Sequence, residues 1–238
     1  MIQATTSTDP FTLEALANTA SDSLVPNQQD TPRGLLQQAD CYLQRFIKYP
    51  GIVVCHSYAE FIHAIWLEMD VDVTSFVPQP FKLYVHGRCY IPDCYVIHKG
   101  QPQVIELKAE GQFNVAWLNE IALYFKWHDL PFSVISNDAM LSHETEALHW
   151  LPIIQLLAQA NEIGIQTEKI EFKLLDKSYS LGTSYVGNLI TPGATDQYLE
   201  RIALYRLIYA HRLLVDLRYR PLSWDTELSL CPLYGDND

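Results

Sequence analysis

Three charged side chains near the middle of the chain have types and spacing that could hold a metal ion and hydrolyse a phosphodiester. Residues 90–110 read YIPDCYVIHKGQPQVIELKAE, so Asp93 follows a proline while Glu106 and Lys108 close an apolar run. Carboxylate oxygens are the ligands that Mg²⁺ and Mn²⁺ prefer, and such an ion stabilises charge on a phosphate and acidifies water. Lys108 could orient that water or neutralise the phosphate, and the Leu107 carbonyl could be a further ligand.

A β-hairpin would bring these residues together. A turn at 99–100 predicts that Asp93 lies directly opposite Glu106, with Lys108 on the same face of the sheet. Opposed carboxylates destabilise a sheet unless a cation lies between them or they share a proton. The alternate residues, which we expect to point into the core, are Pro92, Cys94, Val96, Ile105 and Leu107. The alternative is a surface hairpin in which Lys108 pairs with Glu106 or with Glu110.

A third carboxylate, Glu60, lies in the first turn of a helix predicted over residues 58–69. That helix is apolar nearly all round, which predicts that it is buried. Glu60 could face the Asp93 side of the site. The segment Ser57–Tyr–Ala–Glu60 also has the pattern of a capping box, in which the glutamate bonds back to the Ser57 N–H. From these residues alone the capping role is favoured.

The order of predicted elements indicates a mixed α/β layer. Apolar spacing and turn residues predict helices over 35–48, 58–69, 113–128 and 143–160, extended segments at 74–85, 89–97 and 102–108, and a buried strand at 132–136. The middle of the chain therefore has a helix, three strands, a helix and a strand, with an antiparallel hairpin among the strands. Nearer the C-terminus we expect a helix over 196–212 and an extended segment at 213–220.

Composition limits the class of protein. The chain has 238 residues, of which 48% are hydrophobic, enough for one and a half to two domains with a real core. Its five cysteines are an odd number spread singly, which favours a reducing compartment. It has neither a basic-then-apolar signal pattern nor an apolar run of the roughly 20 residues that a membrane span needs. We therefore expect a cytoplasmic protein with no membrane association.

Charge and polarity vary along the chain. The net charge of −12 disfavours a protein that binds nucleic acid tightly on its own. Residues 196–220 nevertheless hold five arginines against three acidic residues, so this stretch is about +2. Residues 1–34 are polar, and we expect them to be disordered apart from a fragment of helix at 11–17.

Residues 57–108 resemble the nuclease domain of the TnsA family, the endonuclease subunits of heteromeric transposases. The shared features are the glutamate of the first helix, then DVDV, QPF, YIPD and ELK, in the order and spacing of the family. Residues 117–136, WLNEIALYFKWHDLPFSVIS, are similar to the helix and strand that follow. The resemblance covers about residues 55–137 and implies the PD-(D/E)xK fold, a restriction-endonuclease-like mixed sheet flanked by helices.

By this resemblance Glu60, Asp93, Glu106 and Lys108 would be the catalytic set, with Gln79 of QPF as a secondary site residue. A weaker similarity of the last hundred residues to the family implies a small winged-helix-like domain that contacts partner proteins. The domains expected are a polar segment over 1–34, a nuclease domain over 35–140, and the winged-helix-like domain with its tail over 141–238. The side chains that we expect to bind DNA or a partner are Arg201, Arg206 and Arg212.

The function implied is Mg²⁺- or Mn²⁺-dependent cleavage of double-stranded DNA at the 5′ ends of a transposon in a bacterial cell. A DDE-type transposase would cut the 3′ ends, and an AAA+ regulator could be a further partner. One alternative is a stand-alone restriction, defence or repair nuclease of the same fold. Another is a non-catalytic docking subunit of a transposition complex, although an intact Glu60, Asp93, Glu106 and Lys108 set argues against it.

Overall fold

A computed structural model of the chain describes residues 16–31, 40–111, 114–193 and 195–232. It divides into two compact units, each of which is discontinuous in sequence. Unit 1 comprises residues 1–44, 53–64 and 72–142, and unit 2 comprises residues 45–52, 65–71 and 143–238. The expected boundary at 140/141 is close to the 142/143 division, but the two short segments of unit 2 were not anticipated. None of the described helices is long and apolar enough to cross a membrane.

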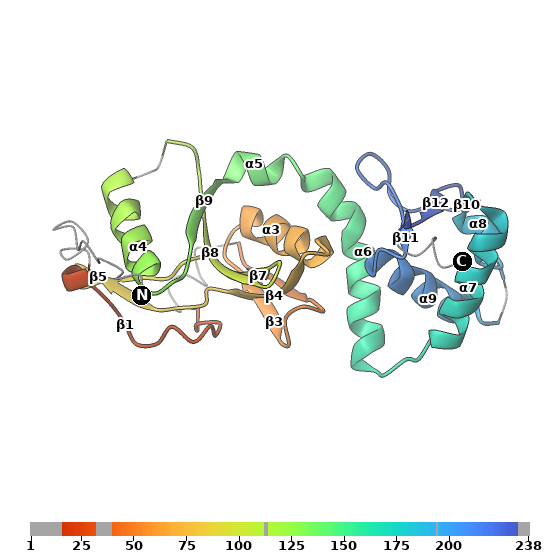
Figure 1. The fold of residues 1–238 in the computed structure, drawn as a ribbon, viewed down its shortest axis with the longest axis horizontal. Helices are drawn as coiled ribbons and strands as arrows, with labels where there is room; N and C mark the ends of the chain where they lie inside the picture. The colour runs from red at the N-terminus through yellow and green to blue at the C-terminus, as the bar shows by residue number, and fades with distance from the viewer. Residues whose placement is uncertain (1–15, 32–39, 112–113, 194, 233–238) are drawn as a thin grey trace, which may run out of the picture. The chain divides into compact units, whose positions relative to one another are not determined.

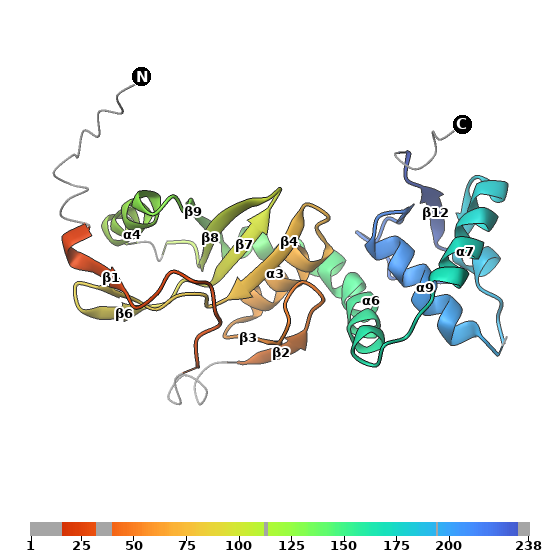
Figure 2. The ribbon, with the colours of Figure 1, turned by 60° about the horizontal axis from the view of Figure 1, so that its bottom comes forward.

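The main sheet of unit 1 is mixed and has four strands in the order β4-β7-β8-β9 (Figure 2). These strands are β4 (Val73–Pro78), β7 (Cys94–His98), β8 (Gln101–Lys108) and β9 (Phe132–Ser136). β4, β7 and β8 are antiparallel neighbours, whereas β9 is parallel to β8. The parallel pair is joined by helix α4 (Val115–Trp127), as a parallel connection requires. The predicted mixed α/β layer is therefore confirmed.

The hairpin has the predicted register. His98 pairs with Gln101 and Cys94 pairs with Ile105. Lys99 and Gly100 form the turn with φ angles of 51° and 73°, and two positive values are what a two-residue type I′ turn needs. Extending this register by one residue places Asp93 opposite Glu106.

Helices cover both faces of this sheet, and the alternation of residues along β8 shows which helix covers which. Val104 packs in a core cluster with Ile121, Tyr124 and Phe125 of α4. Leu107, which points the opposite way, lines a cavity with Ala64 of helix α3 (Tyr58–Met69). Because neighbouring residues of a strand point to opposite faces, α3 and α4 lie on opposite faces. The glutamate and the leucine of ELK therefore belong to different layers.

Besides the main sheet there are a three-stranded sheet, formed by β1 (Thr19–Ser21), β5 (Leu83–Val85) and β6 (Arg88–Tyr90), and a two-stranded sheet, described below. The three-stranded sheet is antiparallel, in the order β1-β5-β6. β1 lies within the segment expected to be disordered, so that prediction does not hold for residues 19–21. The fragment of helix expected at 11–17 lies almost wholly outside the described residues.

The prediction of a helix over residues 35–48 is wrong for the second half of that range. Residues 42–45 form strand β2 (Tyr42–Arg45), which pairs with β3 (Ile52–Cys55). The ring of Tyr42 stacks on that of Phe61, with centroids 5.1 Å apart and an interplanar angle of 15°. Packing against a residue of α3 therefore outweighs the local helical spacing. Residues 32–39 lie outside the described part.

Unit 2 is built mainly from helices α6 (Glu144–Glu162), α7 (Glu168–Leu181), α8 (Val186–Leu189) and α9 (Gln197–Tyr209) (Figure 1). A small antiparallel sheet has the order β10-β12-β11, from β10 (Ser184–Tyr185), β12 (Glu227–Leu230) and β11 (Leu213–Leu214). The helix expected over 196–212 ends earlier, at Tyr209, and the extended segment expected at 213–220 is a strand only at 213–214. α7 was not predicted. A five-residue helix, α5 (Asn137–Leu141), follows β9 in unit 1.

A buried carboxylate ties three segments of unit 2 together. Glu68, at the end of α3, is fully buried and accepts hydrogen bonds from the backbone N–H groups of Ile47 at 2.9 Å and Lys48 at 3.1 Å. The Tyr209 hydroxyl of α9 donates a third, at 2.8 Å. The Lys48 ammonium binds the Asp70 carbonyl at 2.5 Å. Burial raises the pKa of Glu68, and these donors oppose the rise.

Candidate active site

Asp93 lies where the chain enters β7, in unit 1. Its Oδ2 atom accepts a hydrogen bond of 2.6 Å from the backbone N–H of Leu107 on β8. The pKa of Asp93 is raised well above its usual range by burial first, and then by the negative charges of Glu106 and Glu60. The carboxylate is therefore held in place at a position where its charge is costly.

Glu106 is buried beside Asp93, with only 1% of its surface exposed. One of its oxygens, Oε2, accepts a hydrogen bond of 2.6 Å from the Tyr90 hydroxyl. The other, Oε1, forms an ion pair with the Lys108 ammonium, whose side chain is 37% exposed. Burial raises the pKa of Glu106, while Lys108 and Tyr90 oppose this rise. The Lys108 ammonium therefore neutralises part of the charge of Glu106, and its partly exposed side chain remains accessible to solvent.

Glu60 makes the contacts of a helix cap and also lines a cavity with Asp93. Its N–H donates to Ser57 Oγ at 3.2 Å, and Ser57 Oγ donates to Glu60 Oε1 at 2.9 Å, so Ser57 caps α3. Glu60 Oε2 accepts from the His56 N–H at 3.0 Å, one residue before the N–H that the capping box predicted. The same oxygen also accepts from the Gln79 side-chain amide at 3.0 Å. The cap therefore leaves Glu60 connected to the rest of the site.

Gln79 links the Glu60 and Asp93 parts of the site. It is 4% exposed, its amide Nε2 donates to Glu60, and its backbone N–H donates to the Asp93 carbonyl at 2.9 Å. Its φ of 42° is in the left-handed region that non-glycine residues seldom occupy. Its Oε1 atom is buried without a hydrogen-bond partner. Strain and an unmet acceptor are both features that cluster at functional sites.

A small cavity of about 10 Å³, which is room for about one water molecule, lies between α3 and the sheet. Glu60 and Asp93 both line it. Its other lining residues are Cys55, His63, Ala64, Phe76, Pro78, Cys94 and Leu107. Glu106 and Lys108 do not line this cavity. The residue between them in sequence, Leu107, does line it and donates a hydrogen bond to Asp93. Glu60 and Asp93 thus share the cavity, and Asp93 is linked through the Leu107 N–H to the strand that carries Glu106 and Lys108.

A hard divalent cation suits the chemistry of the Asp93–Glu106 pair. Burial and mutual repulsion raise the pKa of Asp93, and a cation near both carboxylates would relieve this repulsion. Both Glu106 oxygens have a protein donor, but a carboxylate oxygen has two lone pairs and can be shared. The Leu107 carbonyl as a third ligand stays a prediction. Within the described residues, Glu60, Asp93 and Glu106 do not form a group with ligand atoms all within 4.8 Å of one another.

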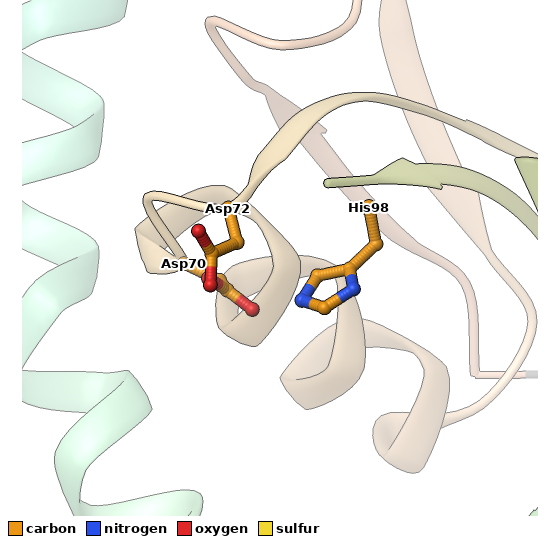
Figure 3. Close-up of side chains that lie close together, drawn as sticks. All are labelled: Asp70, Asp72 and His98. Carbon is orange, nitrogen blue, oxygen red and sulfur yellow. The ribbon is translucent and has the colours of Figure 1, made fainter. Parts of the chain in front are cut away.

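In the described part of the chain, a different group of three side chains does have ligand atoms that all lie within 4.8 Å of one another. Asp70 and Asp72 follow α3 and His98 ends β7, and each could offer one ligand atom (Figure 3). Asp70 and Asp72 belong to the DVDV segment that takes part in the resemblance, but the sequence analysis did not select them or His98 as ligands. The Lys99 ammonium lies 3.2 Å from Asp72 Oδ2 and balances a carboxylate charge there. This group therefore has less need of a cation than the buried Asp93–Glu106 pair.

The three arginines expected to bind DNA or a partner occupy different environments in unit 2. Arg201 is exposed on α9. Arg206 donates to Thr167 Oγ1 at 2.5 Å, Asn161 Oδ1 at 3.0 Å and the Ile165 carbonyl at 2.7 Å, so it holds the start of α7 in place. Arg212 lies beyond the end of α9, although the helix expected over 196–212 would have included it.

Two residues at the site were missed by sequence reasoning. Tyr90 was predicted only as part of an extended segment, since its contact with Glu106 depends on where β6 lies. His63 lines the cavity from α3, and burial lowers its pKa to about 4. Because His63 lies in an apolar helix, its burial could have been predicted from the sequence, but its position beside the cavity could not. Neither the known protein-family models nor the curated proteins include a match to this chain.

Proposed function

We propose that the chain is a metal-dependent DNA endonuclease, the TnsA-like subunit of a heteromeric transposase, which cuts the 5′ ends of a transposon. The observation that carries the proposal is the Asp93–Leu107 hydrogen bond beside the Glu106–Lys108 ion pair. The bond brings together the half-buried carboxylate of Asp93, the buried carboxylate of Glu106 and the Lys108 ammonium at one end of a mixed sheet. An ordinary surface hairpin would leave such charges in solvent instead of burying them.

The architecture of each unit supports the finer expectation of fold. The mixed sheet β4-β7-β8-β9, with α3 and α4 on opposite faces, is compatible with a restriction-endonuclease-like domain. In unit 2, the chain order α7, β10, α8, α9, β11 and β12 with one small antiparallel sheet is compatible with a winged-helix-like domain. In this proposal, unit 1 would carry the chemistry and unit 2 would contact partners.

In the proposed mechanism, Asp93 and Glu106 would hold one or two Mg²⁺ or Mn²⁺ ions, and the Leu107 carbonyl would be a further ligand. When bound, the metal supplies positive charge for the phosphate and acidifies a water molecule. The Leu107 N–H keeps Asp93 Oδ2 in place. Lys108, paired with Glu106 and partly exposed, can neutralise the phosphate or orient the attacking water. Glu60, oriented by Gln79, adds negative charge beside Asp93.

Substitution of Asp93 by asparagine tests this proposal. Asparagine keeps an acceptor for the Leu107 N–H but removes the charge that would hold the metal. We expect Asp93→Asn to abolish nicking of plasmid DNA in Mg²⁺ or Mn²⁺, with partner proteins supplied, while the circular dichroism spectrum is unchanged. Asp138→Asn, at an exposed position on α5, is the matched control and should cut normally. Retained cleavage by Asp93→Asn would end the nuclease assignment.

A non-catalytic docking subunit is the second candidate, and one observation favours it. Both oxygens of Glu106 already have protein donors, so the charges at the end of β8 are partly balanced without a metal. In that case Mn²⁺ would not bind at Asp93 and Glu106, and Asp93→Asn would leave the assembly of a transposition complex unchanged. A Mn²⁺ titration of the unmodified chain separates the two candidates directly.

A further inference from the structure

Tyr90 is held rigidly next to the buried carboxylate of Glu106. It ends β6 and pairs with Leu83 of β5, a fully buried residue. Its ring meets that of Trp117 on α4 edge-on, with centroids 6.4 Å apart and an interplanar angle of 90°. The hairpin fixes its backbone and α4 fixes its ring, so the direction of the hydroxyl is determined by the fold.

The Tyr90 hydroxyl bonds one particular oxygen of Glu106. It donates to Oε2 at 2.6 Å, a length typical of a strong hydrogen bond to a charged acceptor. The other oxygen, Oε1, belongs to Lys108. Glu106 is 1% exposed, so water cannot readily replace the phenol. The two Glu106 oxygens therefore have different environments, and Tyr90 creates the difference.

We propose that Tyr90 is a positioning residue for the metal site, which fixes Oε2 of Glu106 so that Oε1 is presented to Lys108 and to a divalent cation. The inference rests on the proposed function, since it requires that Glu106 bind metal. Outer hydrogen bonds of this kind orient metal ligands and stabilise their charge, and their loss commonly weakens metal affinity about 10- to 100-fold. Tyr90 itself touches neither metal nor DNA in this proposal.

The test is a Mn²⁺ titration of the full chain without DNA, followed by electron paramagnetic resonance of the free ion. We expect Tyr90→Phe, which removes only the hydroxyl, to raise the Kd for Mn²⁺ by about 10- to 100-fold. Tyr95→Phe is the matched control, because Tyr95 packs against the same core cluster whereas the donor to Glu106 Oε2 is Tyr90. Its Kd should equal that of the unmodified chain. Asp93→Asn should bind no Mn²⁺ at this site.

A second measurement allows for any loss of stability. For each variant the melting temperature is measured with and without Mn²⁺, so that each protein serves as its own reference. The rise caused by Mn²⁺ should be smaller for Tyr90→Phe than for Tyr95→Phe. Equal affinity in the two tyrosine variants, with binding that still requires Asp93, would overturn the role of Tyr90 alone. Absence of Asp93-dependent Mn²⁺ binding in the unmodified chain would overturn the proposed function, and this inference with it.

Discussion

The backbone N–H of Leu107 donates a 2.6 Å hydrogen bond to Oδ2 of Asp93. Leu107 lies between Glu106 and Lys108 in sequence, so the residue in the middle of ELK holds the first carboxylate while its two neighbours supply the other charges. A shift of β8 by one residue would break the bond and reverse all three side chains.

The repulsion within this site makes a prediction about stability. Because burial, Glu106 and Glu60 raise the pKa of Asp93, its ionised form at neutral pH costs folding free energy in the absence of metal. Asp93→Asn should therefore raise the free energy of unfolding at pH 7, measured by urea titration in the presence of a chelator. Asp138→Asn removes an exposed charge and should change it by less. A loss of stability in Asp93→Asn would contradict the conclusion that the charge of Asp93 is destabilising beside Glu106 and Glu60.

Glu60 gives a prediction that separates capping from site chemistry. Glu60→Gln keeps side-chain oxygen at this position but removes the charge, so we expect DNA cleavage to be lost with little change in the melting temperature. Ser57→Ala removes the capping hydroxyl and should cost about 0.5–2 kcal/mol of stability with cleavage retained. Melting and nicking assays on both variants decide the matter. The reverse pattern would make Glu60 a cap alone.

His63 should make the protein sensitive to acid. It is 3% exposed, and burial lowers its pKa from 6.5 to about 4. The unfolded chain therefore takes up a proton first, so the contribution of neutral His63 is complete above pH 6.5 and is lost as the pH falls towards 4. The full difference is roughly 3 kcal/mol.

The variant His63→Leu cannot titrate, and it isolates this effect. Urea unfolding at pH 7, 5.5 and 4 should show the unmodified chain losing stability relative to His63→Leu by up to roughly 3 kcal/mol over this range. If the two proteins lose stability in parallel, His63 is not the group responsible.

Tyr209→Phe should destabilise unit 2, because it removes one of the donors to the fully buried Glu68. A loss of about 1–3 kcal/mol is expected from a buried charged acceptor. The loss should be larger at pH 7 than at pH 4, since the hydrogen bond favours the ionised form of Glu68. Tyr205→Phe, on the same helix, is the matched control, and equal losses in the two variants would exclude a specific role for the Glu68 bond.

The arginines of unit 2 should differ in effect. The isolated chain, at −12, should bind duplex DNA weakly and cut it little until a transposase subunit brings the DNA to Asp93. Arg201→Ala should weaken this binding uniformly, with a salt slope lower by about one and an unchanged melting temperature. Arg206→Ala should instead lower the melting temperature, because three hydrogen bonds to the end of α6 and to the residues that lead into α7 are lost. Fluorescence anisotropy at several salt concentrations measures the binding.

Efficient cleavage of naked duplex by the isolated chain at physiological salt would contradict this dependence on a partner. The stand-alone restriction, defence or repair nuclease would then be the better proposal. Replacement of Arg201 should in either case leave Mn²⁺ binding at Asp93 and Glu106 unchanged.

Local signals were sufficient where an element is determined by its own residues. α3 has the bounds predicted from its apolar pattern, and the turn at Lys99–Gly100 set the register of β7 and β8. That register is why the adjacency of Asp93 and Glu106 could be predicted. β9 likewise has its predicted bounds, because a short apolar run followed directly after an end-of-helix signal.

Distant contacts explain what the sequence could not reveal. β2 is a strand because Tyr42 packs on Phe61, and nothing in the local spacing reflects that contact. α7 was missed because the helix is polar on average and buries little, its buried residues being Leu174 and Ser178. The bond from Tyr90 to Glu106 joins β6 of the small sheet to β8 of the main sheet, and sequence patterns do not encode a contact between strands of different sheets.

The donors that surround Glu68 have a consequence for how the chain could be divided by genetic engineering. They come from residue 47, residue 48 and α9, so unit 2 depends on peptide groups encoded about a hundred codons upstream of its main segment. A truncated chain that begins at residue 143 would lack Glu68 and its backbone donors and would expose Tyr209. Unit 2 therefore should not behave as a portable cassette that recombination or cloning could move to another protein intact.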